Sequence, residues 1–146
     1  MIIQIIAAFL ATVFFSIMFN VNKYQLLYCG IVGASGWAMY LFSTHLDLSI
    51  VVSSFLASMV VSILSHILAI KRKNPVTTYQ IAGIIPIVPG AGMYRTLFYL
   101  IEDQLMLANE YLVETLQIAG AISVAMLIVY SISIFINKLK YSTLTD

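Results

Sequence analysis

Long apolar stretches, separated by short polar turns, run through most of the chain. Each stretch is close to the ~20 residues that a helix needs to cross the hydrocarbon core of a bilayer. The pattern predicts an all-α integral membrane bundle in which residues 1–146 form a single transmembrane domain. Five spans are predicted, over residues 2–19, 26–42, 48–70, 79–100 and 116–136.

The fourth predicted span contains an interruption that a simple membrane anchor does not need. Pro86 and Pro89 each lack an N–H group and clash with the preceding helical turn. Gly90 and Gly92 allow backbone angles that other residues avoid. We therefore expect a helix, an unwound turn and a second short helix that begins near Ala91. Backbone groups freed inside a bilayer cost several kcal/mol unless they are satisfied, so the break should face a protein interior or a polar cavity.

Arg95 follows this break by one helical turn and would face the same cavity. The N–H groups at the start of the second half-helix, together with this cation, suit the carboxylate of a small substrate. Tyr94 could add a hydroxyl group, although a tyrosine at the membrane interface has a simpler explanation. The alternative for Arg95 is a place near the outer membrane edge, where it reaches water or pairs with Glu102 or Asp103.

Polar side chains recur at every fourth position of the third span, from Ser54 through Ser58 and Ser62 to His66. This spacing places them along one stripe of a helix. Such serines often permit close packing or bond to their own helix. They could instead form the polar wall of a substrate path. With that second interpretation included, the candidate substrate-binding residues are Pro86, Pro89, Gly90, Gly92, Tyr94, Arg95, Ser58 and Ser62.

Composition excludes a soluble protein. Of the residues, 62% are hydrophobic and 9% are charged, whereas a soluble domain carries about 25% charged residues. No nucleic-acid partner is expected. Between the fourth and fifth predicted helices, the acids Glu102, Asp103, Glu110 and Glu114 alternate with apolar residues. This segment, residues 101–115, could form a short helix on the membrane surface.

The distribution of charge predicts the orientation. Basic residues occupy the first, third and last polar segments, as Lys23, the cluster Lys71–Lys73, and Lys138 with Lys140. With five spans these segments share one side, as the positive-inside rule requires. We expect a multi-pass protein of the inner (plasma) membrane, with its N-terminus outside and its C-terminus in the cytoplasm. A four-span model would place Lys23 and the Lys71–Lys73 cluster on opposite sides.

Catalytic and metal-binding patterns are missing from the sequence. It contains no HExxH, GxSxG, GxxxxGK or paired-cysteine motif. His45 and His66 fall at opposite ends of the third span, so they cannot share a metal ion. Ser65 and His66 are neighbours in sequence and would point about 100° apart on a helix. We expect neither an enzyme nor a bound cofactor.

Several segments together resemble the small subunit of the threonine/serine exporter family. They are Phe19-Asn20-Val21, the glycine-rich stretch Gly30–Gly36, Phe55–Met59, Pro75, and Ile85-Pro86-Ile87-Val88-Pro89-Gly90. The resemblance covers nearly the whole chain, and its most specific part is the PxxPG pattern of Pro86–Gly90. The acidic residues between 102 and 114 match no feature of the family that we can identify.

The resemblance implies one half of a secondary exporter for small carboxylate-bearing metabolites, either threonine and serine or a dicarboxylate such as succinate. The chain would work with a larger membrane subunit of the family, or as a homo-oligomer, in contact with membrane lipid. Two such halves commonly move about a site near the midplane of the membrane. The alternative function is that of a membrane scaffold that stabilises a larger protein without transporting anything. In that case the Pro/Gly break is a packing kink.

Overall fold

The computed structural model describes the backbone of residues 1–142 and the side chains of residues 1–135. Every regular element in that part of the chain is helical, which confirms the predicted helical membrane bundle. The α-helices are α1 (Ile2–Met18), α2 (Leu26–His45), α3 (Ile50–Arg72), α4 (Val76–Ile84), α5 (Gly90–Ile101) and α6 (Leu105–Ser142). Two 3₁₀ turns, η1 (Lys23–Gln25) and η2 (Ile85–Ile87), precede α2 and follow α4.

Three helical segments among the described residues are long and apolar enough to cross a membrane: Lys23–His45, Ile50–Arg72 and Leu105–Phe135. The bent pair Val76–Ile87 and Gly90–Ile101 makes a fourth if it is counted as one span. The apolar helix α1, with 17 residues, is shorter than these. The topology of five spans therefore stays a prediction. Lys138 and Lys140, on which part of the orientation depends, lie beyond the described side chains.

Small residues of α2 allow neighbouring helices to approach closely. A side chain on Gly30 would meet Phe9, and one on Gly33 would collide with Thr12, both on α1. On the same helix, a side chain on Gly36 would collide with Val61 of α3. Helices in lipid associate mainly through such packing. The glycine-rich part of α2 therefore joins α1 to α3.

The last helix begins at Leu105, eleven residues earlier than the sequence suggests. A three-residue turn with Asp103 in a left-handed conformation (φ 60°) separates it from α5. The prediction of a separate surface helix over residues 101–115 is wrong, because Glu110 and Glu114 are good helix formers and do not interrupt α6. With 38 residues, α6 is about 57 Å long, nearly twice the thickness of the hydrocarbon core.

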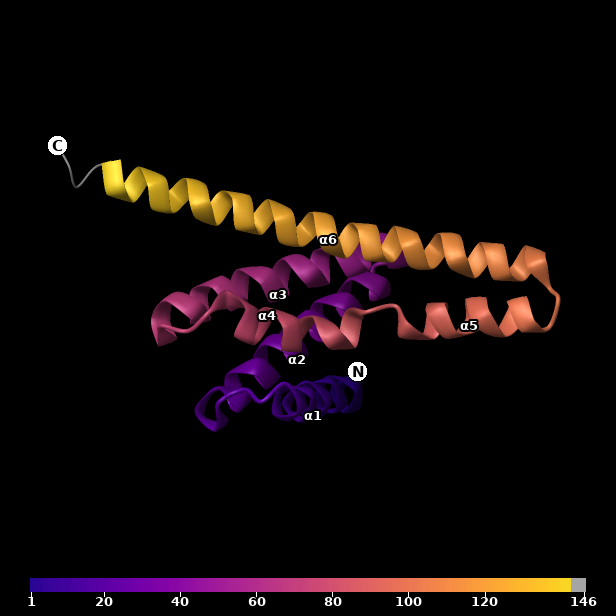
Figure 1. The fold of residues 1–146 in the computed structure, drawn as a ribbon, viewed down its shortest axis with the longest axis horizontal. Helices are drawn as coiled ribbons and strands as arrows, with labels where there is room; N and C mark the ends of the chain where they lie inside the picture. The colour runs from indigo at the N-terminus through magenta and orange to yellow at the C-terminus, as the bar shows by residue number, and fades with distance from the viewer. Residues whose placement is uncertain (143–146) are drawn as a thin grey trace.

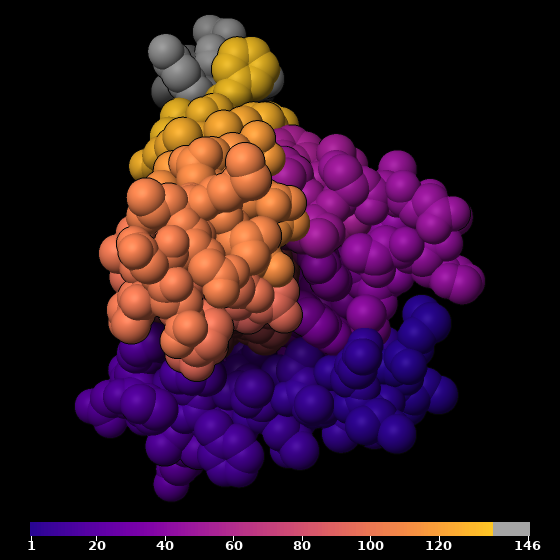
Figure 2. Space-filling model, turned by 90° about the vertical axis from the view of Figure 1, so that its right-hand side faces the viewer, coloured from indigo at the N-terminus to yellow at the C-terminus, as the bar shows by residue number. Residues whose placement is uncertain are grey.

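α5 and the first turns of α6 form an antiparallel hairpin that projects beyond the other helices (Figure 1). Figure 2 shows this hairpin end-on, in orange, in front of the remaining bundle. α4 and α5 follow one another in the same general direction, so the chain continues across the break rather than turning back. The break therefore lies where the hairpin leaves the bundle.

Candidate functional site

The predicted break in the fourth span is present. α4 ends at Ile84, η2 follows, and the axis bends by 49° before α5 begins at Gly90. Pro89, with φ −78° and ψ 53°, is at the centre of an inverse γ-turn in which the N–H of Gly90 donates to the carbonyl of Val88 at 2.8 Å. Gly90 would otherwise donate to Pro86, so the helical hydrogen-bond ladder is interrupted at this point.

The two glycines at the break act differently from what the sequence suggests. Neither has a positive φ, so unusual backbone angles do not explain them. A side chain on Gly92 would collide with the hydroxyl of Thr115 on α6, whereas one on Gly90 would meet nothing within 4 Å. Gly92 is needed because α5 and α6 approach closely at this point.

A cavity of about 340 Å³ lies against the break and is bounded by several helices. Its lining comprises Trp37 and Tyr40 of α2, Ile50 and Ser54 of α3, Pro86, Ile87, Val88 and Pro89 at the break, Ala91, Gly92 and Arg95 of α5, and Tyr111, Glu114, Thr115 and Ile118 of α6. Small-molecule sites commonly have volumes of about 300–1,000 Å³. The cavity is therefore large enough for a small metabolite.

The cavity lies toward one end of the bundle. On α3 it is lined by Ile50 and Ser54, which belong to the first two turns. The basic cluster Lys71–Lys73 is at the opposite end of that helix. Along α3, the cavity therefore lies nearer to the end opposite the basic cluster.

A second and larger cavity, of about 460 Å³, lies at the other end of α4. It is lined by amide, hydroxyl and apolar side chains, among them Asn20, Gln25 and Thr77, and by no charged residue. Part of this polar lining is already bonded within the protein, because Gln25 accepts a hydrogen bond of 2.7 Å from Tyr79. The cavity at the break is the better candidate for a charged substrate.

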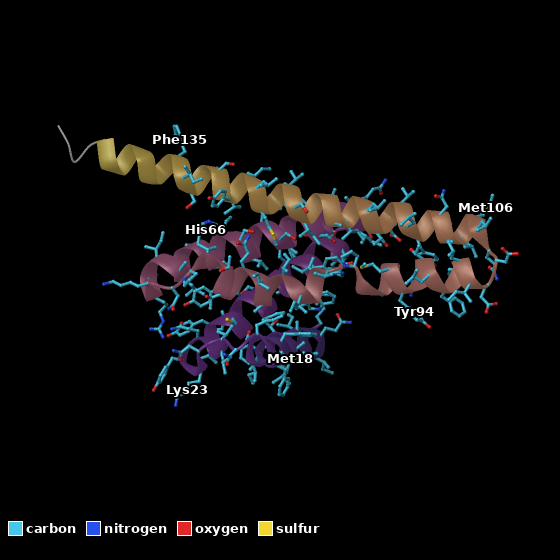
Figure 3. All side chains as sticks on the ribbon, in the orientation of Figure 1. Met18, Lys23, His66, Tyr94, Met106 and Phe135 are labelled. Atoms are coloured by element: carbon cyan, nitrogen blue, oxygen red, sulfur yellow. The ribbon has the colours of Figure 1, made fainter. Side chains whose placement is uncertain are left out.

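Arg95 lines the cavity at the break, one turn into α5. Its guanidinium carbon is 5.4 Å from the centre of the Tyr111 ring, a cation–π geometry. Tyr94, by contrast, projects from the face of α5 that is turned away from α6 and is 68% exposed (Figure 3). The structure thus brings together Pro86, Pro89, Gly92 and Arg95, and leaves Gly90 and Tyr94 outside the cavity lining.

The serines of α3 divide in the same way. Ser58 is fully buried, and its hydroxyl donates to the carbonyl of Ser54 at 2.7 Å. Ser62 is also buried and accepts a hydrogen bond of 3.3 Å from Gln80 of α4. Neither lines the cavity, whereas Ser54 does. Packing and bonding to the same helix explain Ser58, and bonding between helices explains Ser62.

Sequence reasoning missed the wall that α6 contributes. Tyr111, Glu114, Thr115 and Ile118 follow the spacing of three, four and seven residues that marks one face of a helix. That periodicity could have identified the wall. It was hidden because residues 101–115 were expected to form a separate helix.

The cavity therefore combines a guanidinium, a carboxylate and the interrupted backbone at the start of α5. Among the described residues, no group of three or more His, Cys, Asp or Glu side chains is placed to hold a metal ion. Interrupted helices that present backbone groups and charged side chains to a cavity are typical of membrane transport proteins. The arrangement suits binding of a small charged molecule.

A helical membrane bundle with such a cavity is typical of the class of membrane transport proteins. More specifically, the chain belongs to the threonine/serine exporter family, because the family described as "Threonine/Serine exporter, ThrE" matches residues 4–132. An uncharacterized protein of Haemophilus influenzae is 28% identical over 88 residues, which are 60% of this chain and 30% of that relative. The chain therefore covers less than a third of the relative's length in this match. No solved structure matches the chain.

Proposed function

We propose that the chain is one subunit of a secondary exporter for small carboxylate-bearing metabolites, and that the cavity at the helix break is its substrate site. Arg95 binds the substrate carboxylate there. The N–H groups at the start of α5 add a partial positive charge from the helix dipole. Family membership supports the transport activity, and the site rests on the geometry of the break.

The observation that carries this proposal is that Arg95 and the interrupted backbone line the same cavity. The guanidinium and the interrupted backbone both favour an anion. Pro86 and Pro89 cause the break, and Arg95 follows it by one helical turn, so both features depend on local sequence. A guanidinium can bind a carboxylate through two parallel hydrogen bonds, which fixes its orientation as well as its affinity.

The exporter requires a second membrane half in this proposal. The chain matches 30% of its longer relative, and a carrier usually places its site between two halves that move against each other. A larger subunit of the same family, or a second copy of this chain, would supply that half. We place the assembly in the inner (plasma) membrane, with the C-terminus in the cytoplasm.

The experiment is an efflux measurement in cells whose chromosomal copy is replaced by Arg95→Ala or Arg95→Lys. Arg95→Ala should reduce efflux of labelled substrate about ten- to a hundredfold, because hydrogen bonds to a charged group contribute about 1.5–3 kcal/mol. Arg95→Lys should keep part of the activity, since it keeps the charge and loses the paired geometry. Leu97→Ala, on an exposed side chain of α5 outside the cavity, is the matched control.

The membrane content of each variant must be measured in the same cells. Unchanged efflux from Arg95→Ala at normal membrane content would contradict the proposed site. If deleting the chain abolishes assembly of a larger protein while no variant at the cavity changes efflux, the scaffold function is favoured instead.

A further inference from the structure

We propose that Glu114 determines substrate specificity by binding the ammonium group of a zwitterionic substrate, so that the cavity prefers amino acids to dicarboxylates. This inference rests on the proposed function and deepens it. Neither the sequence patterns nor the family match assigns a role to Glu114.

Glu114 is placed at the cavity by the face of α6 to which it belongs. It is half-buried, and it lines the cavity together with Tyr111 and Thr115. The acid one turn earlier, Glu110, is exposed and does not line the cavity. The first turns of α6 thus carry two glutamates of the same chemistry, of which one reaches the site.

Arg95 and Glu114 are the two charged residues in the cavity lining. A substrate that carries a carboxylate and an ammonium group can satisfy both charges at once. A dicarboxylate bound through Arg95 would instead bring its second negative charge into a cavity that already contains Glu114. Like charges within a few ångströms repel strongly where water is partly excluded.

Two hydroxyl groups in the uncharged lining are left as hydrogen-bond acceptors. On α6, next to Glu114 in the sequence, the hydroxyl of Thr115 donates to the carbonyl of Tyr111. On α3, the hydroxyl of Ser54 donates to the carbonyl of Ile50. Because each hydroxyl hydrogen is used within its own helix, the lone pairs of the oxygen remain available as acceptors. An ammonium group offers donors only, and it matches this part of the cavity. The start of α5 and Arg95 supply the donors that a carboxylate needs.

The test compares three probes of four carbon atoms each. L-threonine carries both charges, 3-hydroxybutyrate is the same molecule without its ammonium group, and succinate carries two carboxylates and no ammonium group. Binding and efflux of each are measured in membrane vesicles from cells in which Glu114→Gln, or the matched control Glu110→Gln, replaces the native chain. Glutamine keeps the size of the side chain and removes its charge.

We expect the native protein to bind L-threonine at least about tenfold more tightly than 3-hydroxybutyrate, since a site built for a charged donor rejects an analogue that lacks it. Glu114→Gln should abolish this preference by weakening threonine binding, leave 3-hydroxybutyrate unchanged, and improve succinate binding. Glu110→Gln should change none of the three.

An equal loss for all three probes in Glu114→Gln would show a structural role and overturn the inference. Unchanged threonine preference would also overturn it. These outcomes can be distinguished from failure of the proposed function, which is tested by Arg95→Ala. If Arg95→Ala loses binding of all three probes while Glu114→Gln changes none, the proposed site is supported and the specificity role of Glu114 is excluded.

Discussion

The guanidinium carbon of Arg95 lies 5.4 Å from the centre of the Tyr111 ring, and this contact joins the two helices of the projecting hairpin at the cavity wall. The ring of Tyr111 also stacks on that of Tyr99, with 5.4 Å between centres and 4° between planes. Tyr111 is therefore held by α5 while it positions a cation of α5. Its aromatic ring, rather than its hydroxyl, makes both contacts.

Removing the ring of Tyr111 should weaken substrate binding, although the positive charge of Arg95 that binds the substrate carboxylate is kept. A cation–π contact contributes about 0.5–2 kcal/mol, so Tyr111→Ala should raise the KM for efflux about two- to thirtyfold. Tyr111→Phe keeps the ring and should change KM little. Equal effects of the two substitutions would show that the hydroxyl, and not the ring, is the important group.

Gly92→Val should separate α5 from α6. The new side chain would collide with Thr115, and overpacking of this kind costs about 1–3 kcal/mol. Gly92→Val should lower the thermal unfolding temperature in detergent. Gly92→Ala should lower it as well, and the second substitution Thr115→Ala should partly restore it in that variant. Gly120→Ala is the control, because nothing lies within 4 Å of its added carbon. That change should stabilise α6 by about 0.5–1 kcal/mol. A native-like Gly92→Val would contradict the close approach of the two helices.

Tyr79→Phe should destabilise the end of the bundle that is opposite the cavity. The buried hydroxyl of Tyr79 donates to Gln25 at 2.7 Å and accepts from Asn74 at 3.4 Å, which links α4 to the loop before α2. Both partners are half-buried, so the loss of each hydrogen bond costs about 0.5–1.5 kcal/mol. Thermal unfolding of the purified protein measures the loss, and Tyr24→Phe, at a residue 68% exposed, serves as the control. Equal unfolding temperatures for both variants would exclude a role of this network in stability.

The orientation can be tested with reporters fused after Lys140. The basic segments predict that this end of the chain is cytoplasmic. Alkaline phosphatase, which is active only outside the cytoplasm, should be inactive there, and a cytoplasmic fluorescent reporter should be bright. The opposite pair of results would invert the predicted topology.

The break and its cation could be predicted from the sequence because both depend on local chemistry. Pro86 and Pro89 remove helical donors wherever they stand, and Arg95 follows them at a fixed helical spacing. The roles of Gly90 and Gly92 could not be separated in this way. Their difference depends on Thr115, which is more than twenty residues away in sequence and meets only one of them.

The wall contributed by α6 depended on where that helix begins. The sequence assigns Glu114 to an acidic surface segment, because charged and apolar residues alternate there. Because α6 is continuous, Glu114 instead lies with Tyr111, Thr115 and Ile118 on the face toward the cavity. Ser58 and Ser62 were similarly ambiguous, since a stripe of serines has the same spacing whether it faces a path or a neighbouring helix.

The hairpin has a consequence for local stability. α5 packs chiefly against α6, whereas α3 is enclosed by α2, α4 and α6. A helix held along one face, and joined to α4 through η2 and a γ-turn, opens at a lower free energy than an enclosed one. Amide hydrogens of Gly90–Ile101 should therefore exchange with deuterium ahead of those of α3. The segment that carries Arg95 can thus open at the cavity while the helices that enclose α3 stay packed.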